Sequence, residues 1–380
     1  MDRRIAPLFA IVLLSLAIGC VEPFDIPVRN EDVGFLVVDG YINTNTHTAT
    51  VSLSRAIPLS SSAAFPRELN ASVFIEEDGG EEIQLNDLSN GIYERTDMRF
   101  VNGKRFRLRL ITASRREYTS EYIIAKNTPP IDSLSWSASP EGVTIKLDTE
   151  DPENKTKYYR WEFSETWKYD ATFSSEYKLE HGFAVPRPPA EQVKTCYASE
   201  PSSQIITGST INFTTDKFVD QEITVIPFLS QKTRLHYSIL VKQYALSKEG
   251  YDYWQQLSIN TESLGGLFDP QPSQLRGNIT RSDDSDEPVI GYFDGGSVSE
   301  KRLFIEYREL PDYLQVIPIN YECRQELMTL DSLHTLDNTY LLTHAVYWDF
   351  ILVGYNYTPV ECADCRQQGG TTQKPSFWPN

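Results

Sequence analysis

Five cysteines offer the most distinctive chemistry in this chain of 380 residues. Cys20 directly follows Gly19 and the apolar run from Ile5 to Ile18, and Arg3 and Arg4 precede that run. The run is shorter than the roughly 20 apolar residues of a transmembrane helix, and it is typical of a signal peptide. A small residue and then Cys at its end is typical of bacterial lipoprotein signals. We expect cleavage after residue 19 and acylation of Cys20; the alternative is an ordinary secretory signal.

An acylated Cys20 would tether the mature chain to a membrane, since acyl chains contribute about 0.8 kcal/mol per buried methylene. Val21 follows, and an Asp at that position is the usual signal for retention in the inner membrane. We therefore expect the outer membrane, with the chain facing either the cell surface or the periplasm. No later apolar run has the length of a transmembrane helix.

Four more cysteines, Cys196, Cys323, Cys362 and Cys365, follow the signal, and an even number outside the cytoplasm favours disulfides. Four cysteines allow three pairings. Cys362 and Cys365 form a CxxC run that could instead be a redox pair or half of a zinc site. A redox motif should open a helix, whereas this run has loop-forming neighbours. A four-cysteine zinc site usually has two close pairs, which Cys196 and Cys323 do not provide. We favour disulfides and keep both alternatives.

Catalytic motifs are missing from the sequence. The histidines, none in an HExxH pair, are His47, His181, His236, His334 and His344. No GxSxG, P-loop or GxGxxG occurs either. We expect a chain that is not an enzyme and needs no cofactor, with a hydrolase site assembled from distant residues as the least favoured alternative.

Two acidic runs are weak candidates for calcium, because a flexible loop rich in carboxylates can supply oxygen ligands. Their carboxylates are Asp148, Glu150 and Asp151 in one run, and Asp283, Asp284 and Asp286 in the other. Neither run has the spacing of an EF-hand loop. The favoured interpretation of both is a solvated acidic turn, so no metal is expected.

Aromatic residues are the remaining candidates for contact with a ligand or a partner. Trp167, Tyr169 and Phe173 lie near the proline-rich segment 181–203, which we interpret as a long loop. We predict that these three side chains form an exposed set, although large aromatic residues usually belong to a core. Residues 311–380 hold scattered apolar runs, notably Thr343 to Gly354 with Trp348 and Phe350, to which we assign no contact.

The net charge of -18 excludes some partners. Nucleic acid needs clustered Lys and Arg, and so does docking on anionic lipid through a basic face. A composition of 40% hydrophobic and 23% charged residues is that of an ordinary globular protein.

The elements that must position these residues are mostly strands. Residues 33–127 contain short alternating runs such as Lys104 to Ile111, and Asn102-Gly103 is a strong hairpin signal. Thr128-Pro129-Pro130 marks a boundary before the strand-rich residues 128–262. Ser247 is a candidate N-cap for a helix over Lys248 to Ile259.

These patterns predict a mostly β protein with two tandem immunoglobulin-like or prealbumin-like β-sandwiches, a C-terminal extension and one or two short helices. The expected division is a signal peptide over 1–19, a tether over 20–32, a first sandwich over 33–127 and a fibronectin-III-like sandwich with a long insertion over 128–262. Residues 263–380 form the extension, which we expect to pack on the second sandwich.

Several short motifs occur together in one order along the mature chain. Examples are Val37-Val38-Asp39-Gly40, Lys157 to Trp161, Gly291-Tyr292-Phe293 and Cys362 to Arg366. In this order they resemble the DUF4249 family of Bacteroidota outer-membrane lipoproteins, a domain of unknown function. The resemblance implies outer-membrane residence and gene neighbourhood with TonB-dependent receptors, but no reaction and no catalytic residues. The first sandwich also resembles carboxypeptidase-regulatory-like modules, as an analogy of fold alone.

We therefore expect an outer-membrane lipoprotein that acts as a non-catalytic binding or accessory component. Its expected partners are the membrane, through the lipid anchor, and a TonB-dependent transporter used in nutrient uptake. The alternative is a structural or adhesive β-sandwich protein of the cell surface.

Overall fold

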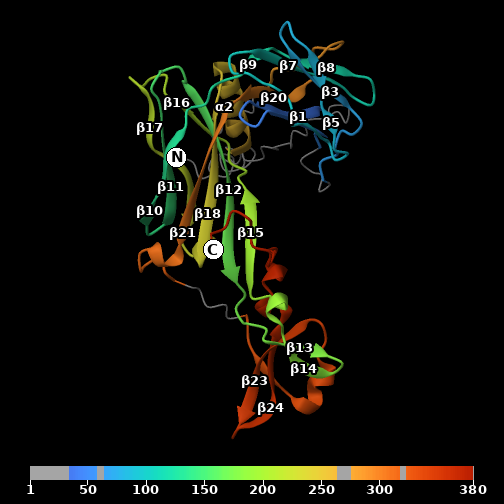
Figure 1. The fold of residues 1–380 in the computed structure, drawn as a ribbon, viewed down its shortest axis with the longest axis vertical. Helices are drawn as coiled ribbons and strands as arrows, with labels where there is room; N and C mark the ends of the chain where they lie inside the picture. The colour runs from blue at the N-terminus through green and yellow to red at the C-terminus, as the bar shows by residue number, and fades with distance from the viewer. Residues whose placement is uncertain (1–33, 58–63, 263–274, 317–321, 380) are drawn as a thin grey trace, which may run out of the picture.

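The computed structural model describes residues 34–57, 64–262, 275–316 and 322–379. Figure 1 shows the first β-sandwich at the top, the second in the middle and a smaller C-terminal module at the lower end. Strands dominate the described residues. The predicted mostly β class with two tandem sandwiches is therefore confirmed. The signal peptide, Cys20 and the tether lie outside the described residues.

The first sandwich consists of two facing sheets. One sheet has the order β20-β1-β2-β6-β5, with β1 (Leu36–Asn43), β2 (Thr48–Arg55), β5 (Asn86–Asp87), β6 (Ile92–Arg95) and β20 (Val289–Gly296). The other has the order β19-β8-β7-β3-β4, and β9 also pairs with β7. Its strands are β3 (Ser72–Glu77), β4 (Glu82–Gln84), β7 (Arg105–Ile111), β8 (Glu117–Ser120), β9 (Ile123–Ile124) and β19 (Ile279–Arg281).

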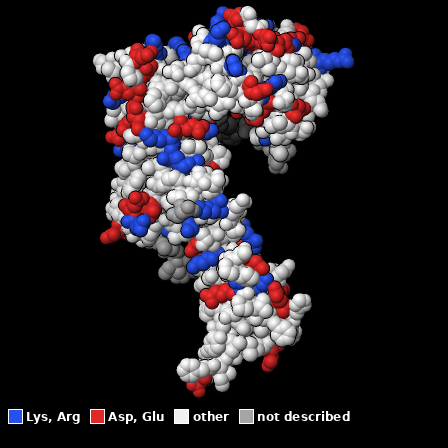
Figure 2. All heavy atoms as spheres, viewed as in Figure 1, with Lys and Arg blue, Asp and Glu red and all other residues white. Residues whose placement is uncertain are grey.

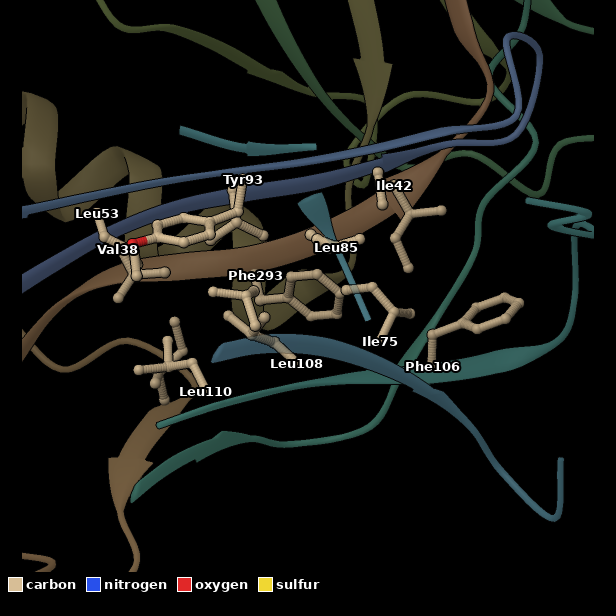
Figure 3. Close-up of a cluster of buried hydrophobic side chains, with 14 of the residues drawn as sticks. Val38, Ile42, Leu53, Ile75, Leu85, Tyr93, Phe106, Leu108, Leu110 and Phe293 are labelled. Carbon is tan, nitrogen blue, oxygen red and sulfur yellow. The ribbon is translucent and has the colours of Figure 1, made fainter. Parts of the chain in front are cut away.

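The core of this sandwich follows from strict alternation along the strands. In β7, Phe106, Leu108 and Leu110 are buried, and the arginines between them face outward. Figure 3 shows these side chains directed at residues of the opposite sheet, among them Val38 and Phe293. Burying such side chains contributes about 1.5–3 kcal/mol each.

Strand β20 differs from our expectation that residues 263–380 pack on the second sandwich. It pairs in parallel with β1, from Leu36 opposite Val289 to Asn43 opposite Gly296. Its inward Phe293 is fully buried in the first core. A Cβ on Gly291 would lie 1.9 Å from the backbone oxygen of Val38, so glycine permits this close approach. A strand far along the chain thus completes the first sheet.

The second sandwich also has two sheets. The smaller has the order β10-β11-β17, with β10 (Ile131–Ser139), β11 (Gly142–Asp151) and β17 (Asp216–Pro227). The larger has the order β15-β12-β18-β21, and β16 also pairs with β12. Its strands are β12 (Tyr158–Asp170), β15 (Thr195–Pro201), β16 (Ile206–Ser209), β18 (His236–Ala245) and β21 (Val298–Glu306). Trp161 is fully buried between the sheets, and its Nε1 donates to Gln243 Oε1 at 2.8 Å.

Helix α2 (Lys248–Glu262) confirms the predicted helix and lies at the junction of the two sandwiches (Figure 1). The Ser247 hydroxyl accepts the Gly250 N–H at 3.0 Å, as expected of an N-cap. The other helices of the described residues are short: α3 (Val360–Ala363) and 3-10 turns over Pro189–Glu191, Gln231–Thr233, Tyr307–Glu309, Leu330–Thr335 and Cys365–Gln368. Within the described ranges, no helix combines the length and apolar character needed to cross a membrane.

The C-terminal module combines two parts of the chain. Strands β22 (Glu326–Thr329), β24 (Ile351–Pro359) and β23 (Tyr340–Trp348) form one sheet in that order. The hairpin of β13 (Tyr177–Glu180) and β14 (Phe183–Pro186) packs on it through Tyr177 and Leu179. The prediction of a long loop over 181–203 is therefore wrong, because the segment contains two strands. In β14, Ala184 packs on the core of the module, and β15 pairs with β12 of the second sandwich.

The last residues of the chain return to the second sandwich. Thr371 forms a bridge with Tyr197 of β15. The ring of Trp378 is only 6% exposed and contacts His236 and Phe304.

Candidate functional site

The lower end of the molecule carries a cluster of exposed apolar side chains. We call it the aromatic tip, and it consists of the apolar residues Tyr347, Trp348, Phe350 and Ile351 together with Asp349 between them. Trp348 is 77% exposed and Phe350 is 98% exposed. These residues end β23 and begin β24, so they project together from the free end of the hairpin (Figure 1). Contiguous apolar exposure of this kind marks an interaction surface more often than a single exposed residue does.

The turn of the aromatic tip has an unfavourable backbone. Trp348 pairs with Ile351, so Asp349 and Phe350 form a two-residue turn, with φ angles of 48° and 65°. Positive φ at both central residues is the type I′ pattern, for which Asn-Gly is preferred. A residue with a Cβ costs roughly 1–2 kcal/mol in this conformation. The chain therefore keeps an exposed aromatic ring where glycine would be more stable, which points to a role outside folding.

The C-terminal module supports this hairpin through a buried core, a hydrogen bond and a disulfide. Leu333, Leu342 and Tyr355 form its buried core, and the Ser175 hydroxyl donates to the Leu342 carbonyl oxygen at 2.9 Å. A disulfide between Cys323 and Cys362 links the segment before β22 to the short helix that follows β24. The tip is thus presented by a covalently fastened sheet rather than by an isolated loop.

Charge at the tip is sparse and negative. Among residues 340–359, Asp349 is the only Asp, Glu, Lys or Arg. Figure 2, which shows one face of the molecule, has no blue group at the lower end. The surface is therefore apolar with a single carboxylate at the turn.

The predicted aromatic set does not form an exposed patch. Tyr169 is only 1% exposed, and its hydroxyl donates to the Cys365 carbonyl oxygen at 2.8 Å. Trp167 is half-buried, with the Lys232 ammonium 5.0 Å from its ring centroid, and Phe173 is half-buried as well. The cause is the returning chain around residue 365, which covers Tyr169. The sequence signal for the residues that are exposed is the Tyr-Trp-Asp-Phe-Ile run, because it places apolar residues in a turn, where polar residues are usual.

The first acidic run uses its carboxylates for local structure. Asp151 accepts the backbone N–H groups of Lys155 and Thr156 at 3.0 and 2.8 Å, and Glu150 pairs with Lys217 at 2.9 Å. A hydrogen bond from the Ser133 hydroxyl lowers the pKa of Asp148. These carboxylates stabilise the C-terminal end of β11 and the turn that follows it.

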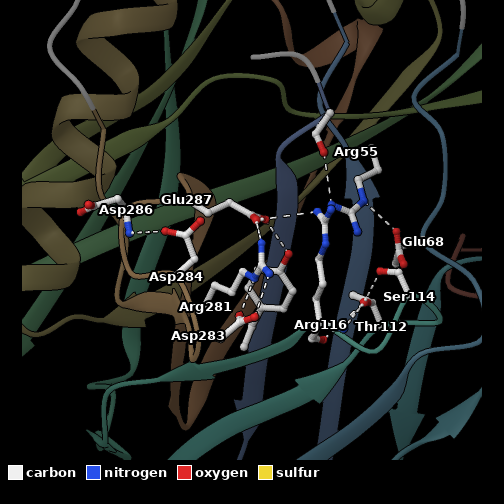
Figure 4. A network of polar contacts seen from close by, with 12 residues as sticks. Arg55, Glu68, Thr112, Ser114, Arg116, Arg281, Asp283, Asp284, Asp286 and Glu287 are labelled. Atoms are coloured by element: carbon white, nitrogen blue, oxygen red, sulfur yellow. Dashed lines mark hydrogen bonds and ion pairs between the residues drawn. The ribbon is translucent and has the colours of Figure 1, made fainter. Parts of the chain in front are cut away.

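The second acidic run is likewise part of a polar network (Figure 4). Asp283 receives two hydrogen bonds from Arg281, at 2.6 and 2.9 Å, and this arginine lowers the pKa of Asp283. Arg281 also pairs with Glu287 at 2.5 Å. Asp284 accepts the N–H of Asp286 at 3.3 Å. In the described part of the chain, no group of three or more His, Cys, Asp or Glu side chains is placed to hold a metal ion.

The four described cysteines form two disulfides, as predicted. Cys196 pairs with Cys365, and Cys323 pairs with Cys362, with Cα–Cα distances of 5.6 Å in both. The CxxC run therefore contributes one cysteine to each bond. The first bond fastens the C-terminal segment to β15 of the second sandwich, and the second lies within the C-terminal module.

Comparisons with known proteins show the family of this chain and a likeness to solved structures. A family model described as "Domain of unknown function (DUF4249)" matches residues 21–302. A solved segment of two fibronectin type-III domains from chicken tenascin is similar at 12% identity, over 55% of this chain and 90% of that chain, with a TM-score of 0.16. No curated protein matches the chain.

Proposed function

Because the chain belongs to the DUF4249 family, a domain of unknown function, we propose its role from its own surface. In this proposal it is a lipid-anchored, non-catalytic accessory protein of the outer membrane. It binds an envelope protein through the aromatic tip. Cys20 is the proposed site of acylation. A TonB-dependent transporter is the proposed partner, and nutrient uptake is the process in which the two would act.

The observation that carries this proposal is the exposure of Trp348 and Phe350 at an unfavourable turn. Aromatic side chains that enter a pocket of a partner commonly supply most of the binding energy of an interface. The end of a hairpin is small enough for an apolar pocket on another protein to cover it. The positive φ of Phe350 lowers the stability of the folded chain. Selection for stability alone would favour glycine at this position.

A protein pocket fits the tip better than a bilayer does. Asp349 lies in the turn itself, and a carboxylate in the hydrocarbon region costs several kcal/mol on most scales, about 2.5–3.5 on insertion scales. Hairpins that enter membranes also gain from flanking Lys or Arg, and residues 340–359 contain neither. A pocket with an apolar floor and a basic rim would satisfy both the rings and Asp349.

The test is an affinity purification of the full chain from envelopes solubilised in mild detergent, followed by identification of the proteins that co-purify. Phe350→Ala combined with Trp348→Ala should reduce recovery of the partner at least about tenfold, as expected when aromatic anchors are removed. Phe183→Ala is the matched control, because Phe183 is 73% exposed on the neighbouring strand β14 and outside the tip.

Three outcomes would count against the proposal. Equal recovery by the tip variant and the control would exclude the tip as the docking surface. Recovery of no envelope protein by the parent chain would favour the structural or adhesive alternative. A Cys20→Ser variant that stays attached to membranes and still incorporates a labelled fatty acid would exclude Cys20 as the anchor.

A further inference from the structure

A cavity of about 500 Å³ lies at the junction of the two sandwiches. The start of α2, the segment that follows β8 and the outward side of β20 form its walls. Tyr158 of β12 and Tyr292 of β20 contribute aromatic rings to these walls. Sites for small molecules usually have volumes of about 300–1,000 Å³, so this cavity is large enough for one.

Asp294 lies at the base of this cavity, on the face of β20 opposite the first core. It is only 6% exposed. Its Oδ1 accepts the Gly295 N–H at 2.8 Å, whereas its Oδ2 has no hydrogen-bond partner among the described residues. A Cβ added to Gly250 would lie 3.2 Å from Oδ2, so the first turn of α2 comes close to the carboxylate. A buried carboxylate with an unpaired oxygen is costly, and such groups are common at binding sites.

The charges around the cavity leave an excess of carboxylates. Three of its four lysines are paired within the chain: Lys155 with Glu153, Lys157 with Asp216 and Lys248 with Asp252. The fourth lysine, Lys126, lines the cavity together with the carboxylates of Glu121, Glu249 and Asp294. Neither Glu121 nor Glu249 forms an ion pair with another described residue. Arg160 also acts on Asp294, but it lies outside the lining and is paired with Glu162. Among the lining residues, one unpaired positive charge and three negative charges remain, and this excess attracts a cation.

We propose that this cavity binds an organic cation, namely a primary ammonium or guanidinium group on a short aliphatic chain. Asp294 supplies negative charge at the base, and Glu121 and Glu249 supply it at the rim. The rings of Tyr158 and Tyr292 cover the aliphatic part of the ligand. This binding does not depend on the partner proposed for the aromatic tip.

A metal ion fits the cavity less well than an organic cation does. Calcium takes six to eight oxygen ligands, and the described residues place no three His, Cys, Asp or Glu side chains together as a metal site. A cavity of this volume with tyrosine walls also exceeds what a single ion fills. An organic cation uses both the charge and the apolar surface.

Three probes of equal length separate charge from shape: the diamine cadaverine, pentanediol and glutarate. Each is added to the full chain in mild detergent, and binding is measured by saturation-transfer NMR and titration. We expect binding of cadaverine but not of the diol or glutarate. Asp294→Asn should weaken cadaverine binding at least about tenfold, because a charged partner is lost. Asp312→Asn, an exposed residue outside the cavity, should leave the affinity unchanged.

A second variant protects the test against misfolding. Glu249 is exposed in the first turn of α2, so Glu249→Gln should fold normally and still bind cadaverine more weakly than the parent. Equal binding of the diol or glutarate would overturn the proposal, and so would unchanged affinity in both cavity variants. Displacement of cadaverine by equimolar calcium chloride would identify a metal site and overturn it too.

Discussion

Replacing Asp294 by asparagine should make the protein more stable at neutral pH. Burial raises the pKa of the Asp294 carboxyl from 3.8 to about 6, although the Gly295 N–H and the charges of Arg160 and Lys126 oppose the rise. Tyr41 of β1 also faces this carboxyl. The folded protein therefore holds the ionised form less readily than the unfolded chain does. Asparagine has nearly the same shape and no charge, so it removes this cost.

The magnitude and its sign follow from proton linkage. At about 1.4 kcal/mol per pKa unit, a rise from 3.8 to about 6 corresponds to a cost of about 3 kcal/mol. The full cost applies above pH 6, where both the folded and the unfolded state are ionised. As the pH falls from 6 towards 4, the folded state takes up the proton first and the cost decreases. Below the unfolded pKa it vanishes.

Urea denaturation of the parent and of Asp294→Asn, each at pH 7.5 and pH 4, measures this effect, because urea carries no charge. The free energy of unfolding should be higher in the variant by up to about 3 kcal/mol at pH 7.5, and nearly equal at pH 4. Asp312→Asn, which is exposed, should match the parent at both. A variant less stable than the parent at pH 7.5, or a difference that persists at pH 4, would refute the reasoning.

Three further variants, one of them a double substitution, test the fold. Phe350→Gly should raise the free energy of unfolding of the C-terminal module by about 1 kcal/mol, measured by urea denaturation, because it relieves a positive φ; a loss of stability would contradict this. Gly291→Ala should cost at least about 3 kcal/mol or abolish soluble expression, since its Cβ would meet a β1 oxygen at 1.9 Å, whereas Gly79→Ala, with open space, should cost much less. Cys196→Ser with Cys365→Ser should lose about 2–5 kcal/mol and expose the C-terminal segment to protease, and an unchanged digestion pattern would argue against that fastening.

Local patterns predicted much of the fold. The alternation of Phe106, Leu108 and Leu110 predicted both the strand and its buried face, because side chains of a strand alternate whatever its partners are. The N-cap Ser247 likewise predicted the start of α2. Such features depend on neighbours in sequence, which a single sequence contains in full.

Features that depend on distant segments were harder to predict. Nothing near Val289 indicates that it lies opposite Leu36, since the partner strand is far away in the chain. Gly291 carries a partial signal, because a glycine inside a strand indicates close approach of another backbone. Tyr169 was predicted to be exposed, and it is buried in a cluster with Cys196 and with Cys365 from the distant C-terminal segment. The apolar run at Trp348 was visible in the sequence. Its exposure was not, because it depends on whether a distant segment of the chain packs against the run.

The parallel pairing of β1 with β20 has a mechanical consequence. The chain enters β1 at Leu36, and it leaves β20 at Gly296 towards β21 of the second sandwich. Leu36 and Gly296 lie at opposite ends of the paired strands, and all eight residues of β1 have partners in β20. A pull on the chain ahead of Leu36, resisted by the second sandwich, would load the pair in shear. All the interstrand hydrogen bonds would then share the force instead of opening one after another.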